Sequence, residues 1–129
     1  MKSSEMRNQL ATISRSLLNL HKLLLNFQKQ NMESLSGKEL SPHELLGMLM
    51  SHADFVWLRK LSTLIVRIDE TVDDKKDLLE STSDELLSAL RDLFIVEEKE
   101  TEFKMRLNIA LKKDNQLSLE VERFKKSIT

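Results

Sequence analysis

Apolar side chains recur along this chain at alternating spacings of four and three residues, the period of one face of an α-helix. One such row lies near the N-terminus and consists of Met6, Leu10, Ile13, Leu17, Leu20, Leu24 and Phe27. Another lies near the C-terminus and consists of Phe103, Leu107, Ala110, Asp114, Leu117, Val121, Phe124 and Ile128. Helices with such a face bury it against other helices, as in coiled coils and helical bundles, so the sequence predicts an all-helical fold.

The composition argues against a β-sheet. The chain has two glycines and one proline, and aromatic residues make up 5% of it, which leaves little turn chemistry and few strand-favouring side chains. Hydrophobic residues account for 40% of the chain, more than a disordered protein carries. A length of 129 residues suits one domain. We therefore expect one all-α domain over residues 1–129, a four-helix-type antiparallel bundle with long first and last helices and one short extra helix.

Capping residues indicate where the first helices begin. The periodic row predicts a first helix over about residues 4–34. Ser41 and Glu44 have the spacing of a capping box, and Pro42 takes the first helical position between them. This arrangement predicts a short helix over residues 42–50.

The next helix is expected to begin at Ser51 or Asp54 and to run to about Val72, unless it continues the short helix through a kink. Its outer face is a polar row of Lys60, Thr63, Arg67, Glu70 and Asp74. Thr82 with Glu85 predicts a second capping box. The helix that it opens would bury Leu86, Leu87, Leu90, Phe94 and Ile95. Residues 97–102 lack apolar side chains and are either a solvated helical stretch or a turn, and the last helix would then run to about residue 127.

No catalytic constellation and no cofactor site is evident in the sequence. The absence of cysteine excludes disulfides, thiolate metal ligands and thiol nucleophiles. Leucine stands three residues before each histidine, so the Glu-x-x-His pairs of di-iron bundles do not occur. His52 and Asp54 could supply two ligands to a metal, with His43 within reach, and these three are the metal candidates. Clusters of carboxylates at helix ends normally stay hydrated and ionised, so we expect no enzyme.

Net charge alternates along the chain, although the total is only −1. Residues 77–102 carry a net charge of −7, and residues 103–129 carry a net charge of +4. The basic last helix could bind the phosphates of a nucleic acid. The neighbouring acidic segment can neutralise those charges, however, and no stacking aromatics accompany them. Nucleic-acid binding is therefore an alternative and not the leading interpretation.

Five residues are candidates for a protein contact. Trp57 is expected in the core, with an exposed hot-spot anchor beside Arg59 as the alternative. Met48 and Met50 fit either a forgiving core or an adaptable groove. Asp114 lies within the apolar row of the last helix, where a carboxylate must find a partner and could fix the register of two helices.

One segment resembles a known group of proteins. It reads Trp-Leu-Arg-Lys-Leu-Ser-Thr-Leu-Ile-Val-Arg-Ile-Asp-Glu over residues 57–70 and is preceded by Ser-Pro-His-Glu-Leu-Leu at residues 41–46. Together these are similar to a stretch of small bacterial all-helical proteins to which no function is assigned. The resemblance covers residues 41–74. Two positions depart from the group, because it often has Asp-Pro near residues 52–54 and proline in place of Lys60. The resemblance implies a bacterial cytoplasmic protein and supplies no activity.

These observations favour a non-enzymatic protein-interaction module, an adaptor or regulator that acts through helix–helix contacts. A small-ligand or metal-binding bundle and a nucleic-acid-associated factor are the alternatives. Long helices with wide apolar stripes predict a homodimer, with a further, unidentified protein as a second partner. The lack of cysteine favours the cytoplasm, and the lack of an uninterrupted apolar stretch of about 20 residues disfavours secretion and membrane insertion.

Overall fold

The computed structural model describes residues 2–96 and 101–129, and most of these residues are helical with no β-strand among them. The all-α prediction is therefore confirmed. The helices are α1 (Ser3–Ser36), α2 (Pro42–Ser51), α3 (Ala53–Val56), α4 (Arg59–Asp73), α5 (Glu80–Phe94), α6 (Glu102–Lys113) and α7 (Asn115–Ile128).

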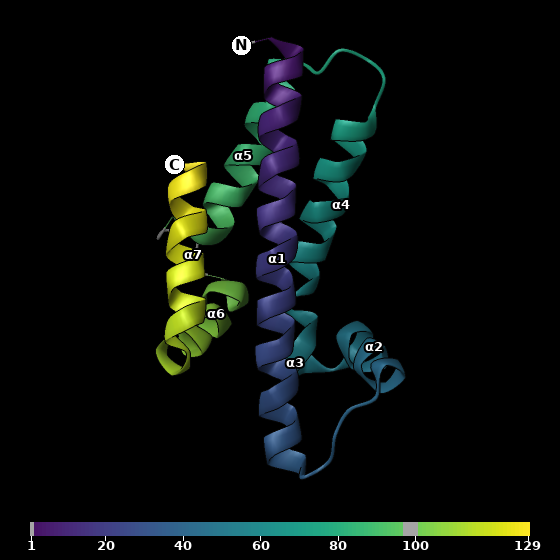
Figure 1. Cartoon of the computed structure of the whole chain (residues 1–129), viewed down its shortest axis with the longest axis vertical. Helices are drawn as coiled ribbons and strands as arrows, with labels where there is room; N and C mark the ends of the chain where they lie inside the picture. Colours follow the sequence, from purple (N-terminus) through teal and green to yellow (C-terminus); the bar gives the residue numbers. More distant parts are fainter. Residues whose placement is uncertain (1, 97–100) are drawn as a thin grey trace.

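Helix α1 is the central element of the fold, as Figure 1 shows. It packs against α4 on one side and against α7 on the other, with α5 behind. The predicted row is buried at Met6, Leu10, Ile13, Leu17, Leu20 and Leu24. The helix ends at Gly37, whose φ of +73° is a left-handed conformation that glycine adopts without a steric penalty. The predicted long first helix is confirmed, and α3, α4, α5 and α7 all contact it.

Polar contacts fix α4 against α1 in an antiparallel arrangement. The hydroxyl of Ser14 donates to a carboxylate oxygen of Asp69, and His21 Nε2 lies 2.9 Å from the Ser62 hydroxyl oxygen. The guanidinium of Arg7 donates to four backbone carbonyls where α4 ends, those of Thr71, Val72, Asp74 and Lys76. These contacts join residues far apart in sequence and set the register of the two helices.

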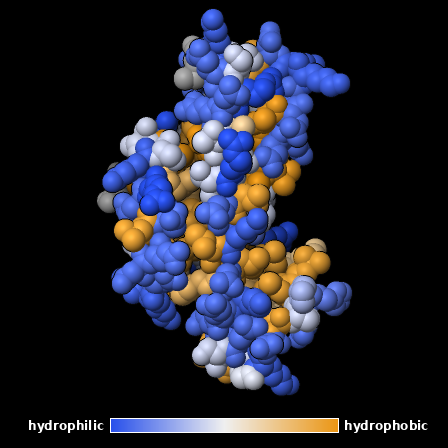
Figure 2. Space-filling model, in the orientation of Figure 1, coloured by the Kyte–Doolittle hydropathy of each residue, from blue (hydrophilic) through white to orange (hydrophobic). Residues whose placement is uncertain are grey.

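Helix α2 begins where the sequence predicts. The Ser41 hydroxyl accepts from the Glu44 amide and the Glu44 carboxylate accepts from the Ser41 amide, so the capping box is confirmed. The hydrogen bond with Ser41 lowers the pKa of Glu44. Helix α2 buries none of its residues, although most of them are apolar. It stands beside the bundle in Figure 1, and Figure 2 shows apolar side chains gathered at that end of the molecule.

The predicted helix after α2 is divided into α3 and α4. His52 caps α3, because its Nδ1 accepts from the Asp54 amide at 3.1 Å. The prediction of Ser51 or Asp54 as the cap was wrong, since the imidazole takes the role that those oxygens were expected to take. A turn at Trp57 and Leu58 then separates α3 from α4 and keeps both of these side chains in the core.

The predicted capping box at Thr82 and Glu85 is wrong. Helix α5 begins at Glu80, and Thr82 lies within its first turn, where its amide donates to the Leu79 carbonyl. The earlier start has a long-range cause, because the Ser3 hydroxyl accepts from the Leu78 amide and the Leu78 side chain is buried. The predicted apolar face is confirmed at Leu86, Leu87, Leu90 and Phe94, and Ile95 packs partly buried against it.

The predicted long last helix is wrong, because it is broken at Asp114 into α6 and α7. Thr101 caps α6 by accepting from the Lys104 amide. Residues 97–100, on which the prediction of a solvated stretch or a turn mainly falls, lie outside the described residues. No helix in the described part of the chain combines the length and the apolar character needed to cross a membrane.

Candidate interaction groove

The bundle is open on the side between α4 and α5. Helix α1 packs closely on α4, and α7 closes the side between α1 and α5, but α4 and α5 make little contact with each other. A surface pocket of about 690 Å³ lies between them. Its lining residues are mostly apolar in area and comprise Val56, Arg59, Lys60, Thr63, Leu64, Ala89, Asp92, Leu93 and Thr101. We call this pocket and its continuation along the two helices the α4–α5 groove.

The sequence explains why the groove has an apolar floor and polar edges. The innermost residues of α4, such as Leu61 and Ile68, are fully buried against α1. Leu64 on α4 and Leu93 on α5 are slightly more exposed than these residues and line the main pocket, so they form its floor. Ala89 supplies only a methyl group on the α5 side, which leaves space that a larger side chain would fill.

The groove continues along α4 and α5 beyond the main pocket. A second, smaller pocket is lined by Arg67, Glu70, Thr71, Asp74, Thr82, Glu85 and Leu86. The two pockets follow one another because α4 and α5 run in opposite directions, with Lys60 near Asp92 and Arg67 near Glu85. Helix α4 has 15 residues and is about 22 Å long, so the α4–α5 groove has room for several turns of a helix.

The two edges of the groove carry opposite charges. The α4 edge has Arg59, Lys60 and Arg67, and the α5 edge has Glu85 and Asp92. None of these five side chains forms an ion pair with another side chain in the described part of the chain. Glu70 and Asp74 extend the negative charge to the end of the groove near the C-terminus of α4.

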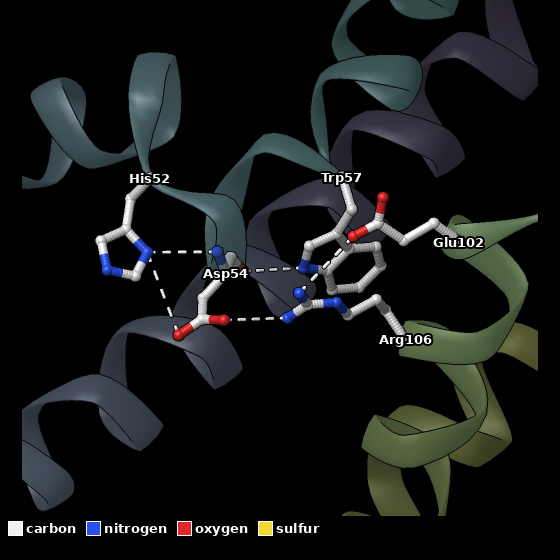
Figure 3. A network of polar contacts seen from close by, with 5 residues as sticks. All are labelled: His52, Asp54, Trp57, Glu102 and Arg106. Atoms are coloured by element: carbon white, nitrogen blue, oxygen red, sulfur yellow. Dashed lines mark hydrogen bonds and ion pairs between the residues drawn. The ribbon is translucent and has the colours of Figure 1, made fainter.

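A polar network holds α6 against α3 at the other end of the groove (Figure 3). Arg106 lies 3.0 Å from the Asp54 carboxylate and 3.5 Å from the Glu102 carboxylate. Asp54 also accepts through its backbone carbonyl from the indole N–H of Trp57 at 2.8 Å. The ion pairs are partly exposed, so each stabilises the fold by no more than about 1 kcal/mol. Their effect is to fix the geometry of this end of the groove.

Trp57 is buried in the core and does not line the pockets of the groove. Only 5% of the side chain is exposed, and its ring packs 5.4 Å from the ring of Phe103. The expected core role of Trp57 is confirmed, and the alternative of an exposed anchor is wrong because the side chain is buried against Phe103, which in turn contacts Phe94.

The other predicted contact residues lie in different places. Arg59 lines the groove and its guanidinium reaches the Met50 carbonyl at 3.5 Å. The side chain of Met50 is 65% exposed, whereas Met48 is half-buried. Asp114 is remote from the groove, because it lines a small pocket between α1 and the start of α7. Its carboxylate accepts from the Leu117 amide and caps α7, so it does not lie within a helix seam.

The metal candidates come together only in part. His52 Nδ1 lies 3.9 Å from an Asp54 carboxylate oxygen, but that nitrogen accepts from the Asp54 amide and the carboxylate binds Arg106. His43 is exposed in the first turn of α2 and does not join them. The described residues contain no group of three or more His, Asp or Glu side chains placed to hold a metal ion.

The sequence predicted the polar edge of the groove but did not predict the groove itself. The row of Lys60, Thr63 and Arg67 read as a solvated face, and nothing in the sequence shows that α5 stands apart from it. The separation depends on the packing of α1 against α4 and α7, which is a long-range property. The small size of Ala89 beside Leu93 is the one local signal.

Comparison of the chain with protein-family models, with curated proteins and with solved structures finds no match.

Proposed function

We propose that this protein is a non-enzymatic interaction module that binds an amphipathic helix of a partner protein in the α4–α5 groove. The observation that carries the proposal is the open side of the bundle, where the largely buried side chains of Leu64 and Leu93 line an apolar pocket between two helices. A partner helix with an apolar stripe would bury this floor and complete the packing of the bundle. Such a contact would also cover the open side of the bundle.

The groove has the features of a site for a helix. Recognition of a helix in a groove relies on apolar anchors spaced one turn apart, set into pockets between two helices. The main pocket and its continuation supply such positions along the length of α4.

A substitution at Ala89 tests the proposal. Ala89→Arg places a long charged side chain over the apolar floor, and we expect it to abolish capture of partner proteins from extracts of the source cells. Ser81→Arg adds the same side chain at an exposed position of the same helix and should leave capture unchanged. Quantitative mass spectrometry of proteins retained by the wild type and the two variants gives the readout. If every retained protein binds the Ala89→Arg variant equally well, the groove is not the binding site.

The size of the main pocket also favours a second candidate, the binding of a small apolar ligand. Its volume of about 690 Å³ lies within the range of ligand pockets. Native mass spectrometry of the gently purified protein separates the two candidates, because a retained ligand adds a small fixed mass and a partner protein adds a whole chain. The same spectrum reports any bound metal and any nucleic acid.

A further inference from the structure

We infer that the partner helix of the α4–α5 groove carries carboxylates along one flank and lysines or arginines along the other. This inference rests on the proposed function and adds the chemistry of the partner. It follows from the charges on the two edges of the groove and from the lack of ion pairs between them.

The α4 edge requires negative charge from the occupant. Arg59, Lys60 and Arg67 follow one another along this edge, and each side chain is exposed. None of the three forms an ion pair with a carboxylate in the described residues, and the protein contact of Arg59 is with the Met50 carbonyl, which carries no full charge. Acidic side chains on the adjacent flank of a bound helix would face them directly.

The α5 edge requires positive charge from the occupant. Glu85 and Asp92 lie on this edge, and Glu70, which belongs to α4, lines the same small pocket as Glu85. Arg67 and Glu85 line the same small pocket from opposite sides without forming an ion pair, because the groove separates them. An inserted helix would lie between these two charges and could pair with both.

A second copy of this chain does not supply such a helix. Helix α2 is the element with an unburied apolar face, and its only full charge is Glu44 in the first turn. It therefore lacks the basic flank that the α5 edge would attract. The apolar faces of the amphipathic helices α4, α5 and α7 are already buried in the core. The fitting occupant is a helix of another protein.

Synthetic peptides with fixed helicity test this inference directly. Four peptides of about 18 residues share one leucine stripe and a hydrocarbon staple on the opposite face. They differ only in the residues on the two flanks of the stripe. The flanks are Glu on one side and Lys on the other, Lys on both, Glu on both, or Gln on both. We expect the Glu/Lys peptide to bind about tenfold more tightly than the other three, measured by fluorescence anisotropy at low salt, because several exposed pairs add small contributions. The Glu/Lys peptide can bind along the groove in either direction, and reversing the direction exchanges its two flanks. One of the two directions therefore places Glu beside α4 and Lys beside α5.

Charge reversal on α4 should change which peptide is preferred. In the variant Arg59→Glu, Lys60→Glu, Arg67→Glu both edges are acidic, so we expect the Lys/Lys peptide to bind most tightly. The control variant Arg15→Glu, Lys22→Glu, Lys126→Glu reverses three exposed charges away from the groove and should keep the preference for the Glu/Lys peptide. Circular dichroism confirms that both variants are folded.

Each outcome separates the inference from the proposed function. If the Gln/Gln peptide binds as tightly as the Glu/Lys peptide, and the α4 variant shows no change of preference, the charge inference is wrong while the groove function stands. If none of the four peptides binds, both are wrong. A change in oligomeric state caused by the α4 variant, measured by analytical ultracentrifugation, would identify a second copy as the occupant and would overturn the inference.

Discussion

At the scale of single residues, His21 shows how one polar side chain is held within an apolar interface. It lies on α1 between buried leucines and makes its one described side-chain contact with the Ser62 hydroxyl on α4. Burial lowers the pKa of His21 below its ordinary value of 6.5, because a charged imidazole would lose hydration that the interface does not replace. The neutral form is therefore the one that fits the folded protein.

We expect this histidine to make the fold less stable in mild acid. As the pH falls through about 6.5, the unfolded chain takes up a proton at His21 that the folded chain does not, so the free energy of unfolding decreases until the lower folded pKa is reached. Urea unfolding at about pH 7.5 and about pH 5.5 measures the decrease. His21→Gln keeps a polar partner for Ser62 and does not titrate, so its decrease should be smaller than that of the wild type. Equal decreases in the two proteins would contradict this prediction.

At the scale of helices, capping chemistry decided which boundaries could be predicted. Ser41, Pro42 and Glu44 each indicate a helix start at the same position, and α2 begins at Pro42. Thr82 and Glu85 had the same spacing but no proline, and the long-range bond from Leu78 to Ser3 moved the start of α5. The capping box at Ser41 was therefore confirmed, whereas the one at Thr82 was wrong because a tertiary contact that local sequence does not show set the start of α5.

Asp114 is the residue for which two sequence features predict different structures. Its position in the apolar row predicted a helix interior, whereas aspartate is also among the best N-cap residues. In the structure its φ of −139° and ψ of 107° are extended, and the carboxylate caps α7. Periodicity could not reveal the break, since α6 and α7 keep their buried residues in the same row, at Ala110 and Leu117.

Substitution of Asp114 distinguishes a cap from a helix interior. We expect Asp114→Ala to lower the free energy of unfolding by about 1 kcal/mol, because the Leu117 amide loses its acceptor. Asp114→Asn keeps a capping oxygen and should retain most of the stability. Chemical denaturation followed by circular dichroism gives both values. A more stable Asp114→Ala variant would indicate one continuous helix, as the apolar row alone predicts.

At the scale of the whole molecule, the apolar stripes of the first and last helices, from which the sequence predicts a homodimer, are not the surface that a second copy would contact. Leu17 and Leu24 are fully buried within a single chain, and the last helix is two shorter helices. The exposed apolar side chains include Leu35 at the end of α1 and Leu46 and Met50 on α2, which are 78%, 56% and 65% exposed. We propose that a second copy covers this end of the molecule (Figure 2).

We therefore expect the wild type to sediment as a dimer and the double variant Leu46→Lys, Met50→Lys to sediment as a folded monomer. Lysines at these positions place charge in the proposed interface without entering the core. The variant Leu79→Lys, Leu119→Lys changes two equally exposed leucines elsewhere and should remain dimeric. Analytical ultracentrifugation over a range of concentrations measures the state. A wild type that is monomeric throughout would show that this face has another use.

The central position of α1 has a consequence for synthesis on the ribosome. Its apolar row is covered by α4 and α7, so α1 keeps part of that row uncovered during synthesis until α7 has been made, on the order of 80 residues later. At typical elongation rates this interval lasts several seconds, far longer than a helix needs to form. The newborn chain therefore carries an apolar helix face that has no partner until the later helices are made.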